Sequence, residues 1–112
     1  MTATNNGKVD WFDMPEEDYR SSRIFRALGS PKAFSVIKLL LENEHLSVEE
    51  ITSRLKRSKW NTSKILRPLR DLDIVRYQKD GRWTLYTLKD RAGMRSIVAA
   101  AAGYMKNNHQ DA

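Results

Sequence analysis

The sequence predicts a mainly α-helical domain with a small β-hairpin, an α+β fold in the order α-α-α-α-β-β-α. Apolar residues recur at helical spacing in five segments, four of which open with a proline or a serine. Between the fourth and fifth segments the pattern changes to β-rich runs around Asp80-Gly81. The chain has 112 residues and no cysteine. One domain can therefore bury an apolar core, and disulfides, thiolate metal sites and cysteine redox chemistry are excluded.

The first two helices are marked by their ends. Pro15 and the three acids after it suit a helix start, because acidic side chains are favourable at the N-terminal end of the helix dipole. Gly29 ends this helix, and Ser30 is the predicted N-cap of the next, with Pro31 in its first position. The apolar stripes are Ile24, Phe25 and Leu28 in the first helix and Phe34, Ile37, Leu40 and Leu41 in the second.

The third and fourth helices are separated by a short turn. Ser47 and Glu50 form a capping box at the start of the third, and Ser58 is the predicted N-cap of the fourth. The stretch from 56 to 70 carries six cations and no acid. The positions expected to face the core are Val48, Ile51 and Leu55 in the third helix and Thr62, Leu66 and Leu69 in the fourth.

Pro68 lies inside this basic helix. It lacks the amide that would bond to the carbonyl of Lys64, which costs roughly 3 kcal/mol in a straight helix interior. We expect either a bend near 64–67 or an early end of the regular helix. The first half of the helix, from Ser58 to Lys64, lies upstream of the proline, so the proline falls on the half that packs against the core.

The segment from 76 to 88 reads as two strands joined at Asp80-Gly81, where glycine supplies the positive φ of a tight turn. Its expected packing residues are Tyr77, Trp83, Leu85 and Tyr86. The last helix begins near Asp90 and carries an apolar stripe with small alanines. Such a terminal helix packs either on the body of its own chain or on a second copy. The stripe consists of Met94, Ile97, Val98, Ala101, Tyr104 and Met105.

We expect one domain over residues 15–106, with a flexible arm at 1–14 and a polar tail at 107–112. Trp11, Phe12 and Met14 are the residues of the arm that are candidates for docking on the body. No apolar run is long enough to span a bilayer, and the first ten residues lack the apolar core of a signal peptide. A cytoplasmic protein is therefore expected.

Positive charge is concentrated in one third of the chain. The formal net charge is +6; residues 54–91 hold 12 of the 20 Lys and Arg residues and 4 of the 14 Asp and Glu residues, a net +8, which leaves −2 for the rest. Such a concentration indicates a polyanionic partner, nucleic acid before membrane. Two short helices joined by a tight turn, the second one basic and followed by a basic hairpin, predict a winged helix-turn-helix.

Over residues 24–88 the chain resembles the ArsR/SmtB family of dimeric transcriptional repressors. FRALGSPKAFSVIKLL is similar to the family's opening, LSVEEITSRLKRSKWNTSKILRPLRDLDIV to its helix-turn-helix and following strand, and KDGRWTLYTL to its wing. The resemblance implies sequence-specific binding to duplex DNA by a homodimer. It also implies a dimer interface made by Ile24 of the first helix and the apolar stripe of the last, with two recognition helices about 34 Å apart on an inverted-repeat operator.

The chain departs from the family where metal-sensing members hold their ions. Ser47 and Glu49 stand at the positions of a Cys-x-Cys in the third helix, and the last helix offers only Asp90 and, in the tail, His109. We therefore expect no metal and no cofactor. Asp73 stands where the family usually has glycine. Aspartate tolerates the left-handed conformation better than most residues, so the turn is expected to survive.

Helix-turn-helix geometry places the N-terminal half of the basic helix in the major groove. Asn61 is expected to pair with adenine, and Lys59 or Lys64 to donate to guanine. Trp60 either lies against a thymine methyl or the sugar backbone, or packs beneath the wing or the arm. The predicted reading residues are Lys59, Trp60, Asn61, Ser63 and Lys64, the predicted phosphate contacts are Arg57, Arg67 and Arg70, and the predicted wing contacts in the minor groove are Lys79 and Arg82.

The same residues bear on two other classes of function, an enzyme and a module that binds RNA or protein. An enzyme is disfavoured because no nucleophile–base set, phosphate-binding glycine loop or carboxylate pair stands out. A winged-helix module that binds RNA or a protein partner stays an alternative, although the acid-free basic stretch argues against a purely protein partner. The input signal is left open between a small molecule, another protein and none.

Overall fold

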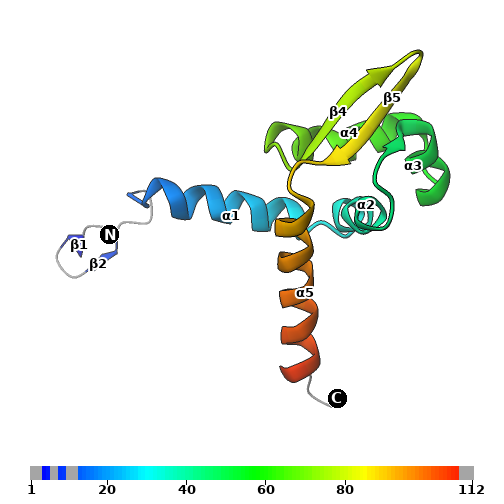
Figure 1. The fold of residues 1–112 in the computed structure, drawn as a ribbon. Coiled ribbons are helices and arrows are strands. Elements are labelled where there is room, and N and C mark those ends of the chain that lie inside the picture. The colour runs from blue at the N-terminus through cyan, green and yellow to red at the C-terminus, as the bar shows by residue number, and fades with distance from the viewer. Residues whose placement is uncertain (1–3, 6–7, 10–12, 109–112) are drawn as a thin grey trace.

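A computed structural model gives the structure of residues 4–5, 8–9 and 13–108. Within these ranges the five helices and the hairpin occur in the predicted order, so the predicted fold class is confirmed (Figure 1). A third short strand joins the hairpin, and two more precede the first helix. The elements are β1 (Thr4–Asn5), β2 (Lys8–Val9), α1 (Glu16–Leu28), α2 (Pro31–Glu42), β3 (Leu46–Ser47), α3 (Val48–Leu55), α4 (Lys59–Asp71), β4 (Val75–Asp80), β5 (Trp83–Leu88) and α5 (Arg91–Asn108).

Serine side chains begin three of the helices, as predicted. The hydroxyl of Ser30 accepts from the backbone of α2, and that of Ser58 accepts from the Asn61 amide at 3.1 Å. At α3 the capping box is complete, because the Ser47 hydroxyl accepts from the Glu50 amide while the Glu50 carboxylate accepts from the Ser47 amide. These local bonds satisfy amide groups that the first turn of a helix leaves without partners.

Pro68 does not end α4. The helix continues for three residues beyond it to Asp71, and the Pro68 carbonyl accepts from the Leu72 amide at 3.1 Å. The predicted early end is therefore wrong, and the bend stays a prediction. Leu69, which follows the proline, is fully buried, so packing of this turn against the core holds it helical despite the missing amide of Pro68.

The antiparallel sheet has the strand order β3-β5-β4. Leu46 lies opposite Tyr86 on one side of β5, and Val75 lies opposite Leu88 on the other. The sequence does not predict β3, because two residues are too short to show an alternating pattern. At the hairpin tip Asp80 pairs with Trp83, so the turn residues are Gly81 and Arg82 rather than Asp80-Gly81. Gly81 has the expected positive φ of 62°.

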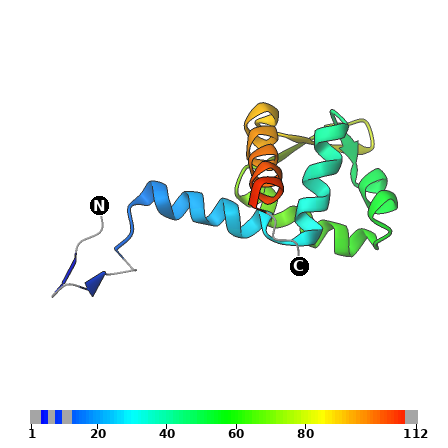
Figure 2. The same cartoon turned by 90° about the horizontal axis from the view of Figure 1, so that it is seen from below.

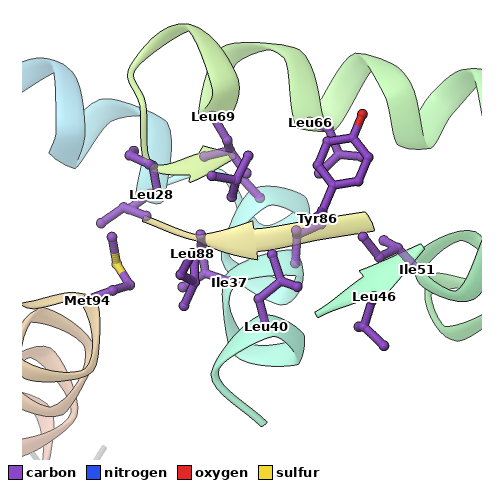
Figure 3. Close-up of a cluster of buried hydrophobic side chains, with 14 of the residues drawn as sticks. Leu28, Ile37, Leu40, Leu46, Ile51, Leu66, Leu69, Tyr86, Leu88 and Met94 are labelled. Carbon is purple, nitrogen blue, oxygen red and sulfur yellow. The ribbon is translucent and has the colours of Figure 1, made fainter. Parts of the chain in front are cut away.

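The core lies between α2, the inner faces of α3 and α4, and the sheet (Figure 3). The predicted inward positions Ile37, Leu40, Ile51, Leu66 and Leu69 are all buried. Figure 3 shows Tyr86 and Leu88 from the central strand entering the same cluster, with Met94 of α5 at its edge. The cluster joins every helix to the sheet.

One side chain ties α5 to the body. The guanidinium of Arg91, the first residue of α5, donates to the backbone carbonyls of Leu40 and Asn43, and to that of Glu44 at 2.9 Å. These carbonyls lie at the C-terminal end of α2, where a cation is favoured by the helix dipole. The direction in which α5 leaves the body is therefore fixed by a polar contact as well as by the apolar core.

Two helices extend beyond this body. In Figures 1 and 2 the N-terminal half of α1 projects away from the sheet and from α2–α4, and Figure 1 shows the C-terminal half of α5 projecting as well. Phe25, expected in the apolar stripe of α1, is 65% exposed, although Leu28 is buried. No helix in the described ranges is both long and apolar enough to cross a membrane.

The predicted arm at 1–14 contains β1 and β2, which pair with each other as antiparallel strands. Trp11 and Phe12, two candidates for docking on the body, lie outside the described residues. The third candidate, Met14, is 36% exposed. The expected flexibility of this segment stays a prediction.

Candidate nucleic-acid interface

A helix-turn-helix is formed by α3, α4 and the three residues between them. Lys56 takes the left-handed conformation (φ 55°) at the end of α3, and Ser58 caps α4. The Thr52 hydroxyl donates to that of Thr62 at 2.9 Å, which donates in turn to the Ser58 carbonyl at 3.1 Å. Thr62 is fully buried. These hydroxyls fix α4 against α3, through a contact that sequence spacing does not reveal.

The N-terminal half of α4 turns its polar side chains to solvent. The buried residues Thr62 and Leu66 hold the opposite face of the helix on the core. This division gives α4 the form that a helix needs to enter a DNA groove, with one face anchored and the other free. All five predicted reading residues lie on the exposed side: Lys59, Trp60, Asn61, Ser63 and Lys64.

Lys59 already has an acidic partner. Its ammonium lies 3.1 Å from a carboxylate oxygen of Glu49 on α3. Hydrogen bonding to the backbone of Glu49 itself, followed by the Lys59 hydrogen bond, lowers the pKa of the Glu49 carboxyl below its ordinary value. Both side chains are exposed, so the pair is weak and can open when DNA approaches. The two lysines therefore differ in availability, because among the residues that the structure describes the charge of Lys59 is paired with Glu49 and that of Lys64 is not.

Trp60 is exposed, at 67% of its surface, and carries the Lys64 ammonium over its ring at 4.3 Å from the centroid. Of the two alternatives left open for Trp60, packing beneath the wing does not occur in the structure, and contact with DNA stays a prediction. The i, i+4 spacing on α4 brings the two side chains together, and a cation above an indole face is an attractive arrangement. Trp60 and Lys64 form one exposed unit on the face predicted to read DNA bases.

The three predicted phosphate contacts are exposed, and they differ in how they are held. Arg70 places its guanidinium over the ring of Tyr77 on β4, at 4.7 Å from the centroid. It therefore links the end of α4 to the wing. Arg57 lies in the turn before α4, and Arg67 on the outer side of the helix.

The wing extends from the body as the hairpin β4–β5 (Figure 1). Arg82 lies in its turn, with the guanidinium 5.5 Å from the ring centroid of Trp83, and Lys79 is exposed on β4 beside it. Tyr86 is buried and Leu85 half-buried, as expected of packing residues. Tyr77 is 47% exposed but still packs on Tyr86, with ring centroids 5.7 Å apart, whereas Trp83 is 45% exposed and does not belong to the core. Successive residues of a strand face opposite sides, and Tyr86 and Leu88 take the inner side of β5.

The apolar stripe of α5 divides into two parts. Met94 and Val98 are buried in the core of their own chain, and Ile97 is half-buried against it. These side chains are already packed, which corrects the expectation that the whole stripe is available to a second copy. Ile24 of α1 is likewise half-buried. The stripe residues left exposed are Ala101, Tyr104 and Met105.

The predicted absence of a metal site rests on the sequence. In residues 4–5, 8–9 and 13–108 no three His, Cys, Asp or Glu side chains gather in a way that could hold a metal ion. Ser47 and Glu49, at the positions of the Cys-x-Cys, are occupied by the capping box and by the pair with Lys59. His109 lies outside the described residues.

The structure resembles several solved regulators. HlyU from Vibrio cholerae N16961 matches with a TM-score of 0.71 at 24% identity, covering 87% of this chain and 100% of its own. M. tuberculosis Rv0081 matches with a TM-score of 0.75 at 22% identity, covering 84% and 93%. The homodimeric winged helix-turn-helix DNA-binding domain of Mb0332 from Mycobacterium bovis, a possible ArsR-family transcriptional regulator, matches with a TM-score of 0.72 at 15% identity, covering 88% and 97%. These likenesses show the fold.

The sequence has a closer relative. It is 33% identical over 75 residues to the HTH-type transcriptional regulator MJ1325 of Methanocaldococcus jannaschii, a match that covers 67% of this chain and 84% of the relative. No model of a known protein family matches the chain. The identity over most of the relative's length, together with the winged helix fold, places the protein: it belongs to the family of HTH-type transcriptional regulators, and its fold is that of the ArsR-type winged helix proteins.

Proposed function

We propose that this protein is a transcriptional repressor that binds an inverted-repeat operator as a homodimer and has no metal site. The observation that supports this most strongly is the polar face of the first half of α4, on which the side chains of Asn61, Ser63 and Lys64 are exposed to solvent. Arg57 at its start and the wing residues Lys79 and Arg82 extend the positive charge on both sides of this face. A duplex offers phosphates to the flanking cations and base edges to the helix.

The residues divide by role in this proposal. Asn61 reads adenine with a bidentate pair, and Lys64, backed by the Trp60 ring, donates to guanine. Lys59 contributes after its pair with Glu49 opens. Arg57, Arg67 and Arg70 bind phosphates and fix the register, while Arg82 enters the minor groove from the wing tip.

The homodimer is supported by the exposed apolar side chains of the two projecting helices. Tyr19 and Phe25 on α1 are 51% and 65% exposed, and Tyr104 and Met105 on α5 are 68% and 61% exposed. Four large apolar side chains on two helices that extend from the body mark an interaction surface. A second copy with the same surface covers it symmetrically.

The salt dependence of binding to duplex DNA tests the first part of this proposal. If a dimer contacts roughly 6–10 phosphates, affinity for a duplex enriched from a random pool falls about 10³–10⁵-fold between about 50 and 200 mM salt. Fluorescence anisotropy of labelled duplex measures this slope, with structured RNA as competitor. A shallow slope, or equal displacement by RNA and by duplex, contradicts duplex-specific binding.

Two alanine substitutions test the assignment of roles. Asn61→Ala is expected to cost about 1–3 kcal/mol on the enriched duplex and to relax the preference at one base pair, because a base-edge contact is lost. Arg70→Ala is expected to weaken binding to all duplexes alike, because its contact is to phosphate. If both variants lose the same affinity on specific and random duplex, the orientation of α4 in this proposal is wrong.

A further inference from the structure

A groove of about 600 Å³ lies between α1, the start of α2 and the side of α4. Tyr19, Arg23 and Arg26 line it from α1, and Lys64 and Pro68 line it from α4. Its volume is in the range of sites that hold small organic molecules, about 300–1,000 Å³. We call this the α1–α4 groove. The contacts proposed with DNA bases do not require a groove at this place.

The lining of the groove is cationic without compensation. Five of its residues are lysines or arginines, and none is an aspartate or glutamate. Among the ion pairs of the described part of the chain, none includes any of these five. Several like charges around one hollow favour an anion that neutralises them. The five are Arg23, Arg26, Lys32, Arg57 and Lys64.

The wall between these cations is apolar. Ala33 and Leu69, which form part of it, belong to the buried core, and Ile65 is half-buried against that core. Pro68 adds its apolar ring to this wall beside Ile65. A ligand that fits the groove has both an apolar body and a negative charge. A charge alone leaves the apolar wall without contacts, and an apolar body alone leaves the cations without a counter-charge.

We propose that the α1–α4 groove binds a small amphipathic organic anion, a carboxylate, sulfonate or phosphate carried on an apolar or aromatic body. The ring of Tyr19, with the Arg23 guanidinium 5.9 Å from its centroid, offers a surface for that body at the α1 side. Of the proposed dimer surface, Phe25, Tyr104 and Met105 do not line the groove, whereas Tyr19 belongs to both.

Binding of this anion opposes DNA binding, a consequence that rests on the proposed function. Arg57 and Lys64 line the groove and also belong to the face proposed to contact DNA. An anion that engages them removes charge from that face, and by linkage DNA weakens the anion by the same factor. A small anion bound in the groove thus causes the regulator to release its operator.

The test uses a pair of dyes with similar rings and different charge. 8-Anilinonaphthalene-1-sulfonate is an aromatic anion, and N-phenyl-1-naphthylamine is its uncharged counterpart; both fluoresce when bound. The folded full-length protein is expected to bind the sulfonate at one site per chain and about ten- to a hundredfold more tightly than the amine, because charged hydrogen bonds add to ring burial. Equal affinity for both dyes overturns the proposal.

Charge-removing variants locate the site. Arg23→Gln/Arg26→Gln removes two cations of the groove, and Lys38→Gln/Arg95→Gln removes two exposed cations outside it. The first double variant is expected to bind the sulfonate about ten- to a hundredfold more weakly, and the second within about twofold of the parent protein. Equal losses in both place the dye elsewhere. Arg26→Gln alone serves if the first double variant does not fold by circular dichroism.

Competition with duplex completes the test. The sulfonate is expected to weaken duplex binding by the parent protein and to have no effect on the Arg23→Gln/Arg26→Gln variant, whose own duplex affinity stays within about twofold. If that variant instead loses duplex affinity as strongly as Lys64→Ala does, the groove is a phosphate-contact surface and the proposal is wrong. If the parent binds no duplex at all, the proposed function fails, while the dye measurements still decide whether the groove binds anions.

Discussion

At the scale of single residues, Asp73 shows how one side chain shapes a turn and balances charge. Its backbone is left-handed, with φ 59°, as the family resemblance predicts. Its carboxylate accepts two hydrogen bonds from the Arg76 guanidinium, at 2.9 and 3.0 Å, and pairs with Lys89 at 3.1 Å. The Arg76 hydrogen bonds, followed by that of Lys89, hold the pKa of the Asp73 carboxyl well below its usual range. These pairs join the turn after α4 to β4 and to the residue that follows β5.

Asp73→Asn is expected to change how stability depends on pH. Asparagine also tolerates the left-handed conformation, so the substitution removes the charge and keeps the turn. A carboxyl with a depressed folded-state pKa contributes stability above its ordinary pKa of 3.8, and that contribution is lost as pH falls below this value. The free energy of unfolding, from urea titrations, should favour the parent at neutral pH, and the difference should shrink below about pH 4. Because the pair is exposed, the difference is also expected to fall with added salt.

A difference between parent and variant that stays constant from neutral pH down to about pH 2 contradicts this assignment. Asp71→Asn is the control, since Asp71 is exposed nearby and takes part in none of the ion pairs of residues 4–5, 8–9 and 13–108.

At the scale of elements, α4 combines two jobs in different halves. Its first half presents the polar face, and its second half packs Leu66 and Leu69 on the core. Pro68 falls in the second half, where it removes an amide that would bond to the Lys64 carbonyl and lines the α1–α4 groove. The helix therefore retains a locally unfavourable residue at the place where it borders the groove.

Pro68→Ala is expected to stabilise the protein by about 2 kcal/mol. Restoring the amide and removing the ring clash favours the helix by about 3 kcal/mol, while the greater freedom of alanine in the unfolded chain offsets about 1 kcal/mol. Urea titration with an unchanged m-value measures the effect, and Arg67→Ala on the neighbouring exposed position serves as control, expected within about 0.5 kcal/mol of the parent. Destabilisation by Pro68→Ala would mean that α4 requires the ring at this position.

At the scale of the whole molecule, a single chain leaves part of its apolar surface without cover. The radius of gyration is 17.2 Å, against about 13 Å for a compact domain of about 100 residues, and Figure 1 shows α1 and α5 projecting from the body. Tyr104 and Met105 are exposed near the free end of α5, while Met94 and Val98 anchor its other end in the core. The projecting halves are thus the surface that a second copy would bury.

Ala101→Arg is expected to produce a monomer at micromolar concentration. Ala101 is exposed within its own chain, so the fold and the helical spectrum should be kept. In a two-fold interface the new charge is buried beside its symmetry mate, at a cost of several kcal/mol. Sedimentation velocity measures the mass, and binding to the enriched duplex is expected to fall far more than binding to random duplex.

Ser96→Arg adds the same charge to an exposed position on another face of α5 and is expected to leave the dimer intact. If Ala101→Arg also stays dimeric and binds normally, the interface lies elsewhere and α5 serves only the core of its own chain.

Much of the candidate interface follows from local chemistry. Ser30, Ser47 and Ser58 cap their helices in the structure because capping depends on residues three apart in the chain. The exposed face of α4 that is predicted to read DNA bases follows from the burial of Thr62, Leu66 and Leu69 at helical spacing. The spacing of residues along the chain does not reveal contacts between different elements. The proximity of the residues in such contacts depends on how the elements pack in the fold. Three examples are the Lys59–Glu49 pair, the Arg70–Tyr77 contact and the Thr52–Thr62 hydrogen bond.

The sequence by itself determined the order of the five helices and the hairpin, the caps and the basic face of α4, because each depends on backbone preferences and periodicity within a few residues. The tertiary structure alone decided that β3 forms, that α4 continues through Pro68, that Met94 and Val98 lie in the core, and that α1 and α4 enclose a cationic groove. These features depend on which surfaces meet. A two-residue strand needs an edge to pair with, and the helix at Pro68 is held by the burial of Leu69. The apolar stripe of α5 is buried along the part of the helix that the body covers and exposed along the part that extends beyond the body.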